Sequence, residues 1–433
     1  MDMDWHTWGS QYSWNRTLVP DPEGWMSSLH SADNPLGYPL KYMVNLHPNG
    51  VSPAETHYDA FAKAMGGVPG SKTSYRCDLS NSTFASAYFD WMMGAAGAPA
   101  APNNKMDYWW TDWGGCGSPA GKNVGSLWWA NYLYHQDKSR IGNGNRGLVL
   151  SRYGGLGTHR YGVGFSGDAP QSYDTLAVQV QMTSQASNVL FGYWSHDIGG
   201  FHNGTVIPGF AKGYPYEGDE DPDNATQSEL YLRWLQFGAF APIFRTHCQE
   251  EPIPQGHVCS PRYNAHCLGC ERRIWKFLHH FPLMKEAMVL RNGMGPYIYT
   301  HVREAFDSGV GLLRPMYYAY PEYDEAYATT ATQYFFGNDM IIAPITTPAN
   351  RPVNGTIAKA VWLPVGRWVS WLGNTTHKGP VAVSQTYSQS DIPVFVRAGA
   401  VIPLKTMASV TSPAPDPMMW LLYPSCGTNT GHV

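Results

Sequence analysis

The sequence predicts an α/β protein: a (β/α)8 barrel of the TIM type that lacks its first strands, followed by an antiparallel β-sandwich domain. Short apolar runs that end in a polar residue alternate six times with loops and amphipathic helices. The polar side chains follow the carboxyl end of each run, which is where parallel barrels carry their active sites. After about Tyr323 the runs become short, often alternating, and separated by Gly, Pro and Asn, which is typical of antiparallel β structure.

The apolar runs give the expected barrel strands in order: 1–4, 41–45, 108–111, 147–150, 189–194 and 241–244. Helices are expected at 54–65, 126–136, 174–187, 228–238 and 271–306, the last interrupted near 293–296. The segment 152–164 holds five glycines and is predicted as a loop. A doubly wound sheet would also alternate strands with helices, but it would more often carry a glycine-rich phosphate loop, and the sequence has no P-loop.

A complete barrel requires eight strands, and the first of the six runs begins at Met1. We therefore expect the catalytic barrel, residues 1–323, to be truncated at its amino end. Residues 324–407 are expected to form a proximal C-terminal β-sandwich. Residues 408–433 would be the start of a truncated distal β-domain. The chain of 433 residues is long enough for one large barrel and a smaller domain.

Composition excludes several classes of protein. Hydrophobic residues make up 43% of the chain and charged residues only 14%, with 17 Trp, 27 Tyr and 45 Gly, which argues against disorder. The net charge is −4 and there is no basic run, so neither nucleic acid nor a membrane surface is an expected partner. No apolar run approaches the roughly 18 residues of a membrane span.

The expected compartment rests on glycosylation sequons. The first residues, MDMDWHTWGS, do not read as a signal peptide. Six N-x-S/T sequons nevertheless occur, at Asn15, Asn81, Asn203, Asn224, Asn354 and Asn374. If they are used, the protein is secreted or enters the secretory pathway or a lysosome-like compartment, and its leader sequence is absent from this chain.

The chain is organised around Met106–Gly115, MDYWWTDWGG. Its first half is aromatic and apolar, which suits a buried strand. Asp112 follows, and a carboxylate in such surroundings costs free energy unless something pairs or uses it. Trp110 and Trp113 flank Asp112, and flat indole faces stack well on sugar rings. The alternative, an aspartate that caps a following helix, has equal weight on this stretch alone.

A second carboxylate, Asp168, follows the glycine-rich segment, although a helix cap before 171–177 is an equally good interpretation. In a barrel both aspartates would reach the same mouth. Two carboxylates there suit glycosyl transfer, in which one attacks the anomeric carbon and the other protonates the leaving oxygen. Arg152, Asp197 and His247 would complete a polar ring able to hold sugar hydroxyls.

These residues resemble glycoside hydrolase family 31, the family of α-glucosidases and α-xylosidases. The resemblance rests on motifs that occur in the order of the family: DMDWH at the start, WWTDWGG, the segment from Arg152 to FSGD, WSHDIGGF, ELYLRWLQFGAFAPIFRTH, and LLRP at 312–315. Each motif is weak by itself, but the ordered set is specific and spans nearly the whole chain.

The resemblance implies a role for each site residue. Asp112 matches the catalytic nucleophile and Asp168 the general acid/base of a retaining double displacement, whose two carboxyl groups should lie about 5–5.5 Å apart. Burial and the like charge of the nucleophile should raise the pKa of the acid. The sugar-binding residues implied are Asp2, Trp110, Arg152, Phe165, Asp197 with Arg245, Phe201 and His247. Neither a metal nor an organic cofactor is required.

Two positions depart from the family pattern. Trp113 follows the nucleophile where Met or a polar residue is usual, and Phe165 stands where Trp is common before the acid/base. Both would touch the subsite of the reacting sugar, so its identity stays open. The predicted reaction is hydrolysis of terminal α-linked glycosides, most simply α-glucosides. The alternative is a catalytically incomplete fragment or a carbohydrate-binding remnant of such an enzyme.

Four cysteines lie in one loop with several histidines: Cys248, Cys259, Cys267 and Cys270. This loop could hold disulfides, free thiols or zinc. Disulfides are favoured because the sequons indicate an oxidising compartment. Cys77, Cys116 and Cys426 have no evident partners in the sequence.

Overall fold

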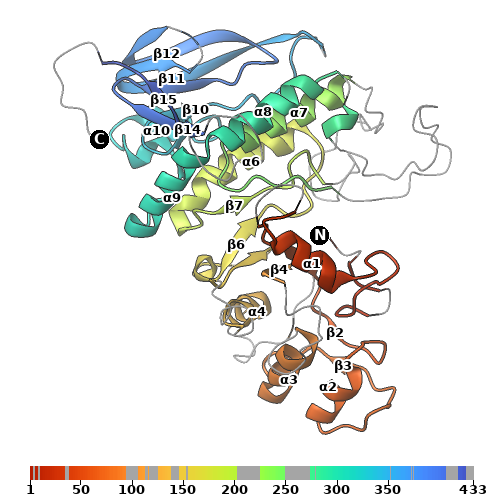
Figure 1. Ribbon diagram of the computed structural model, residues 1–433. Helices are drawn as coiled ribbons and strands as arrows, with labels where there is room; N and C mark the ends of the chain where they lie inside the picture. The colour runs from red at the N-terminus through yellow and green to blue at the C-terminus, as the bar shows by residue number, and fades with distance from the viewer. Residues whose placement is uncertain are drawn as a thin grey trace. The chain divides into compact units, whose positions relative to one another are not determined.

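The computed structural model describes residues 1–2, 5–7, 10–34, 39–93, 106–112, 116, 125–137, 146–152, 155–201, 225–248, 274–277, 279–351, 353–371, 373, 375–405 and 418–425. They fall into two compact units (Figure 1). The first unit comprises Met1–Phe165 and the second begins at Ser166.

Four parallel strands form the sheet of the first unit, in the order β1-β4-β5-β6. They are β1 (Met43–Leu46), β4 (Tyr108–Thr111), β5 (Val149–Ser151) and β6 (Gly162–Phe165). The start of the chain extends this sheet beside β1, because the amino group of Met1 donates to the Met43 carbonyl at 2.8 Å and the Asn45 amide donates to the Met1 carbonyl at 2.9 Å. Parallel strands in register bring their carboxyl ends to one edge of the sheet.

The first unit contains several helices, two of which begin at a capping side chain. The helices are α1 (Pro22–His30), α2 (Tyr58–Ala64), α3 (Ser82–Ala87), which runs into a π-helical turn (Tyr88–Met92), and α4 (Ser126–His135), besides a 3-10 turn at Thr158–Arg160. Asp21 caps α1, with Pro22 in its first turn, and Asn81 caps α3. A short antiparallel ribbon of β2 (Gly50–Val51) and β3 (Tyr75–Arg76) follows β1.

Aromatic side chains dominate the core of the first unit. Trp5 and Trp109 are fully buried, and their ring centroids lie 6.4 Å apart. Trp5 also packs edge-on against Trp14 at 5.2 Å. The aromatic first half of the 106–115 stretch is therefore a buried strand, as predicted.

A disulfide joins Cys77 to Cys116, 39 residues apart in the sequence, with their Cα atoms 4.9 Å apart. Neither cysteine has an evident partner in the sequence, and the structure pairs them with each other. The pairing depends on the close approach of the segments that follow β3 and β4, and local sequence does not reveal that approach.

The barrel-like part of the second unit contains β7 (Trp194–Ser195) and four long helices. These are α6 (Tyr173–Gln185), α7 (Ala225–Ala239), α8 (Phe281–Gly293) and α9 (Gly295–Ser308); 3-10 turns occur at Ala186–Val189 and Ile274–Lys276. Ile198 forms a parallel bridge with Thr246. Trp234 and Phe237 of α7 are buried in the main core of this unit.

An antiparallel sheet follows, in the order β12-β11-β13-β10-β9-β8, as predicted for the C-terminal part (Figure 1). Its strands are β8 (Leu313–Arg314), β9 (Tyr334–Phe336), β10 (Met340–Ile342), β11 (Thr356–Ser370), β12 (Thr376–Ser388) and β13 (Val394–Arg397). A separate ribbon pairs β14 (Val401–Lys405) with β15 (Met418–Leu422). A 3-10 turn (Met316–Tyr318) and α10 (Asp324–Ala328) lie between β8 and β9.

Three sequence-based element assignments differ from the structure. The glycine-rich segment 152–164 contains most of β6, whose Gly162 and Gly164 obscure its strand character. The run 189–194 begins at the end of a 3-10 turn, with Leu190 at φ +66, and only Trp194–Ser195 is a strand. Residues 241–244 form bends and coil and not a strand, although Thr246 just beyond them makes the parallel bridge.

Candidate active site

Asp112 lies directly after β4 and is almost completely buried, with 4% of its surface exposed. Its amide donates to the Leu46 carbonyl of β1 at 3.0 Å, so the backbone continues the sheet for one more residue. The next described helix, α4, has Gly125 at its N-cap. Asp112 therefore ends a strand and does not cap α4.

Side chains from the two neighbouring strand ends hold the Asp112 carboxylate. Arg152 follows β5, and its Nε donates to Asp112 Oδ1 in a buried ion pair. Asn45 of β1 donates from Nδ2 to Asp112 Oδ2 at 3.1 Å. His47, one residue beyond β1, places Nε2 3.6 Å from the same oxygen. The carboxyl ends of β1, β4 and β5 thus converge on one acidic group.

Asn131 of α4 aligns the two strand ends that carry the ion pair. Thr111 Oγ1 donates to Asn131 Oδ1 at 3.1 Å, and Asn131 Nδ2 donates to Ser151 Oγ at 2.9 Å. Thr111 immediately precedes Asp112 and Ser151 immediately precedes Arg152. All three polar side chains are buried, so this bridge fixes the relative position of the ion-paired groups.

These contacts decide the charge of Asp112. Burial by itself would raise the pKa of the carboxyl. His47, the hydrogen bond and charge of Arg152, and Asn45 together outweigh burial and lower the pKa to about 2. Asp112 is therefore an ionised carboxylate throughout the neutral and mildly acidic pH range.

Two aromatic residues pack beside this group. Trp110 of β4 meets Phe165 of β6 edge-on, with ring centroids 5.6 Å apart. The guanidinium carbon of Arg152 lies 5.5 Å from the centroid of the Phe165 ring. Phe165 thus packs on the cation that pairs with Asp112. Asp2 is half-buried at the start of the chain, next to Met1, which is hydrogen-bonded to β1.

Asp168 belongs to the second unit and is half-exposed in the loop that precedes α6. The cap of α6 is Ser172, whose hydroxyl accepts from the Thr175 amide, so the helix-cap alternative for Asp168 is wrong. Gly167 has a positive φ of 69°, and the Ala169 carbonyl accepts from the Phe201 amide at 2.6 Å. These features turn the loop and tie it to the segment after β7.

Asp197, two residues beyond β7, is buried and forms an ion pair with the partly buried Arg245. Arg245 Nε also donates to Ser195 Oγ at 3.2 Å. The Asp197 amide in turn donates to Ser166 Oγ at 3.2 Å, which links this pair to the loop of Asp168. The rings of Phe201 and His247 lie 5.0 Å apart, so the predicted sugar-binding residues of this unit occupy connected segments.

Two glycines make this arrangement possible. Gly199 and Gly200 both have positive φ angles, 99° and 85°. A Cβ on Gly200 would lie 2.6 Å from the Cα of Gln171, which is backbone and cannot move aside cheaply. The GG of the WSHDIGG run is therefore needed for the close approach of two loops.

The neighbouring His196 is completely buried and is held by Gln179 and Thr183 of α6. Burial, followed by the charge of Arg245, lowers the pKa of His196 to about 3. This histidine is neutral and structural.

The structure assembles the sequence-predicted site residues into two sets. Asp112, Arg152, Trp110 and Phe165 meet in the first unit, and Asp168, Asp197, Arg245, Phe201 and His247 occupy connected segments in the second. Sequence reasoning assigned no role to Asn45, His47 or Asn131. Asn45 ends the predicted strand 41–45 and His47 lies two residues beyond it, so both could have been found by that position. Nothing in the sequence distinguishes Asn131 from other helix residues. Trp113 lies outside the described residues.

Among the described residues, no group of three or more His, Cys, Asp or Glu side chains could hold a metal ion. Cys248 takes part in a disulfide, in agreement with the favoured interpretation of its loop. Cys259, Cys267, Cys270 and Cys426 lie outside the described residues. No helix in the described part of the chain combines the length and apolar character needed to cross a membrane.

Comparison with known protein families gives two matches. The sequence model of the TIM-barrel domain of glycosyl hydrolases family 31 matches residues 1–301. The model of the glycosyl hydrolase family 31 C-terminal domain matches residues 309–402.

Individual relatives agree with these matches. The chain is 26% identical over 274 residues to α-glucosidase 2 of Bacillus thermoamyloliquefaciens, covering 62% of this chain and 29% of that enzyme. It is 29% identical over 263 residues to an isomaltosyltransferase of Sporosarcina globispora, covering 60% of this chain and 21% of that enzyme. A family 31 dextranase of Flavobacterium johnsoniae has the same fold, with a TM-score of 0.72 at 21% identity, covering 98% of this chain and 50% of the dextranase chain. The chain thus spans less than a third of the length of these two curated relatives.

Proposed function

Because the chain belongs to glycosyl hydrolase family 31, we propose that it cleaves terminal α-linked glycosides, with α-glucosides as the first substrates to test. In this proposal Asp112 is the nucleophile and Asp168 the general acid/base of a retaining double displacement. Similarity to an α-glucosidase supports glucose as the first sugar. The partner is a carbohydrate, and the reaction requires neither a metal nor an organic cofactor.

The observation that carries the proposal is the environment of Asp112. A carboxylate that attacks an anomeric carbon must be ionised and must be held in a fixed orientation. The ion pair with Arg152 and the hydrogen bond from Asn45 orient the carboxylate. Together with His47 they outweigh burial and lower the pKa of Asp112 to about 2. A buried carboxylate at the end of a parallel strand is costly unless it is paired, and here it is paired at the edge where barrels place their chemistry.

The chemistry assigned to these residues proceeds in two steps. In the first, an oxygen of Asp112 forms a bond to the anomeric carbon while the glycosidic bond breaks and Asp168 gives its proton to the leaving oxygen. In the second, Asp168 takes a proton from water, and the resulting oxygen nucleophile displaces Asp112 with overall retention of configuration. Trp110 and Phe165 would line the sugar site beside Arg152, and Asp2, Asp197 and His247 would bind hydroxyl groups.

A sugar hydroxyl can replace water in the second step, in which case the product is a longer saccharide. The similarity to an isomaltosyltransferase supports a search for this outcome. Product analysis on maltose and isomaltose separates the two: hydrolysis releases only smaller sugars, whereas transfer also yields saccharides longer than the substrate.

Azide rescue of the two aspartate variants tests the assignment. With an aryl α-glucoside, Asp112→Gly should be inactive, and added azide should attack the anomeric carbon directly to give the β-glucosyl azide. Asp168→Ala should still form the covalent intermediate from the activated substrate, and azide should then give the α-glucosyl azide. Proton NMR of the products reads the configuration. Equal activity of wild type and Asp112→Gly would refute the proposal.

We also propose that the protein works in an oxidising compartment of the secretory route or outside the cell. The Cys77–Cys116 disulfide and the disulfide of Cys248 support this, because such bonds rarely persist in a reducing cytosol. Asn81 and Asn354 are exposed and accessible to glycosylation, whereas Asn15 is half-buried. Peptide mass spectrometry of the native protein, with and without deglycosylation, tests this: unmodified sequons together with reduced Cys77, Cys116 and Cys248 would contradict it.

A further inference from the structure

We propose that the Cys77–Cys116 disulfide is a positioning element for Asp112, because it fixes the loop that carries His47 against the end of β4. This inference rests on the nucleophile role proposed for Asp112. It adds a function to a bond that would otherwise serve only to stabilise the fold.

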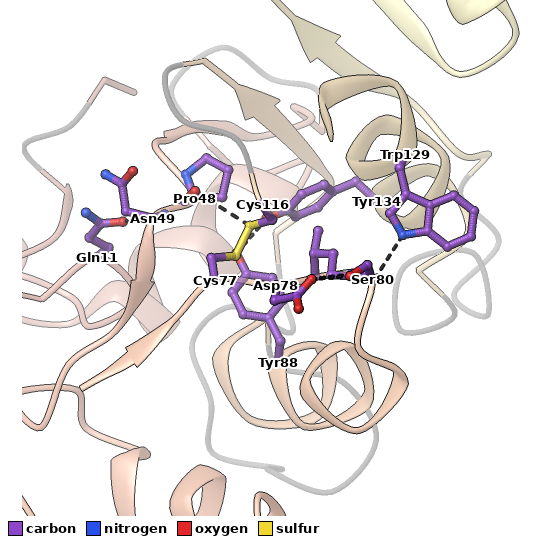
Figure 2. The surroundings of a disulfide bond; sticks show 11 residues. Gln11, Pro48, Asn49, Cys77, Asp78, Ser80, Tyr88, Cys116, Trp129 and Tyr134 are labelled. Atoms are coloured by element: carbon purple, nitrogen blue, oxygen red, sulfur yellow. Dashed lines mark hydrogen bonds between the residues drawn. A yellow bond between two sulfur atoms is a disulfide. The ribbon is translucent and has the colours of Figure 1, made fainter. Parts of the chain in front are cut away.

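Cys116 follows Asp112 by four residues, so the disulfide tethers the chain just beyond the carboxylate. Cys116 Sγ also lies 3.6 Å from the carbonyl oxygen of Pro48 (Figure 2). Pro48 is the residue directly after His47, whose Nε2 lies 3.6 Å from Asp112 Oδ2. One end of the disulfide therefore contacts the loop that supplies a partner of the carboxylate.

Cys77, at the other end of the disulfide, contacts the same loop. Its amide donates to the Asn49 carbonyl at 2.9 Å. The residues that flank these two continue the contact as a ladder, in which Gly50 pairs with Arg76 and Val51 with Tyr75. The other end of the disulfide is therefore hydrogen-bonded to the same loop.

Together these links form a closed ring. It runs from Asp112 along the chain to Cys116, across the disulfide to Cys77, through a backbone hydrogen bond to Asn49, and back through Pro48 and His47 to Asp112. Without the disulfide, the loop after β1 and the segment after β4 would be joined near this point by noncovalent contacts. The disulfide thus restricts the relative motion of the two segments that carry His47 and Asp112.

The disulfide is buried among aromatic side chains. Cys77 and Cys116 are 5% and 0% exposed, and Tyr88 and Tyr134 are among the residues that surround them (Figure 2). The hydroxyl groups of these two tyrosines are hydrogen-bonded to each other. Trp129 Nε1 donates to the Leu79 carbonyl at 2.9 Å, two residues beyond Cys77. Because the sulfur atoms are buried, the disulfide acts as a permanent brace in the folded protein and not as an exposed redox switch.

The test compares the double variant C77A/C116A with wild type and with Met26→Ala, a core variant in α1 that serves as a stability control. Loss of the brace should reduce kcat on an aryl α-glucoside about tenfold or more, since small displacements of a reacting group are costly. The acid limb of the kcat/KM profile should also move to higher pH, because His47 would no longer be held at Asp112. Met26→Ala should lower Tm while leaving both readouts unchanged.

Pro48→Gly provides a second route to the same result, because it loosens the loop while keeping the disulfide. Pro48→Gly should also lower kcat and move the acid limb of the kcat/KM profile to higher pH. If C77A/C116A shows no cooperative unfolding transition, the Pro48→Gly result alone tests whether the loop positions Asp112. Unchanged pH profiles and kcat in the folded variants would overturn the inference and leave the disulfide with a stabilising role alone.

A readout independent of turnover separates this inference from the proposed function. Asp112→Asn should change Tm at pH 6 by less in the C77A/C116A background than in wild type, because the carboxylate would already have lost part of its support. If wild type cleaves no α-glycoside but this coupling is present, the proposed function fails and the positioning inference stands. If wild type is active and the coupling and kinetic changes are absent, the proposed function stands and the positioning inference fails.

Discussion

Each end of β4 carries a buried aspartate that is held by a cationic side chain and a histidine. The two aspartates differ in their remaining partners and, in our proposal, in their roles. Asp107, just before the strand, is 3% exposed and binds Lys41 Nζ at 2.8 Å and His30 Nε2 at 2.7 Å. Asp112, just after the strand, is 4% exposed and is held by an arginine, a histidine and an asparagine. In each case burial would raise the pKa of the carboxyl, and the partners lower it instead.

The difference lies in the partners. The cation at Asp107 is an exposed lysine, and the carboxylate also accepts from the Tyr42 amide at 2.8 Å, so it ties α1 and the start of β1 to β4. The cation at Asp112 is a buried arginine, and no backbone amide is among the partners described above. Parallel barrels place stability at the amino ends of strands and chemistry at the carboxyl ends. Two paired, buried carboxylates therefore lie at opposite ends of one strand, and in the proposed function the polarity of the strand separates the catalytic carboxylate from the structural one.

The largest expected difference concerns activity. Asp112→Asn should reduce kcat/KM on an aryl α-glucoside by about 10⁴-fold or more, because the amide cannot form the covalent intermediate. Asp107→Asn should leave kcat/KM within a factor of about three for the folded fraction, since Asp107 lies at the opposite end of the strand. Steady-state kinetics on both purified variants, with circular dichroism to measure the folded fraction, checks this. A comparable loss in both would show that strand polarity does not separate the roles.

The next difference concerns the cations. Arg152→Leu leaves a buried carboxylate without its ion-pair partner, so the pKa of Asp112 should rise above about 2 and kcat/KM should fall about 10²-fold. The acid limb of the pH profile should move upward in parallel. Lys41→Leu removes a side chain that is 57% exposed, and we expect a loss of less than about 1 kcal/mol in stability with no change in activity. An unchanged pH profile in Arg152→Leu would contradict the account of how Asp112 is kept ionised.

The smallest difference concerns acid stability. A carboxyl whose pKa is lower in the folded than in the unfolded chain stabilises the protein above its unfolded pKa, and this contribution is lost as the pH falls through the folded pKa. For Asp112 the two values are 3.8 and about 2, which corresponds to about 2 kcal/mol lost between roughly pH 4 and pH 2. The pKa of Asp107 is also lowered in the folded protein, so its contribution to stability should likewise be lost as the pH falls.

Urea unfolding of wild type, Asp112→Asn and Asp107→Asn at pH 5, 4 and 3 measures these contributions. Each variant should lose stability less steeply than wild type as the pH falls. Parallel curves for all three proteins would show that neither carboxyl has a lowered pKa in the folded chain.

The sequence predicted the part of the site that local pattern encodes. The aromatic run ending in Asp112 identified β4 and its terminal carboxylate, and the run before Arg152 identified β5. The glycines of β6 obscured a strand because Gly162 and Gly164 provide no side chains for the apolar pattern. The polar sequence of β12 gave no apolar run, and that strand is recognisable only through its long pairing with β11.

The residues that sequence reasoning missed act over long separations. Asn131 links Thr111 to Ser151 across 20 residues on either side, and the Cys77–Cys116 bond spans 39. Such contacts follow from the packing of α4 beside β5 and from the pairing of β3 with β2, which no periodicity in the chain records. The identity of the sugar is likewise outside the pattern, since Trp110 and Phe165 would fit several pyranose rings.

Trapping the covalent intermediate tests most directly whether Asp112 is the nucleophile. The chain is incubated with 5-fluoro-α-D-glucosyl fluoride, digested, and its peptides are mapped by mass spectrometry. We expect a single glycosylated peptide that contains residues 106–112, with the label on Asp112 and none in Asp112→Asn. A label on another carboxylate, or turnover of α-glucosides that proceeds with inversion of configuration, would contradict it.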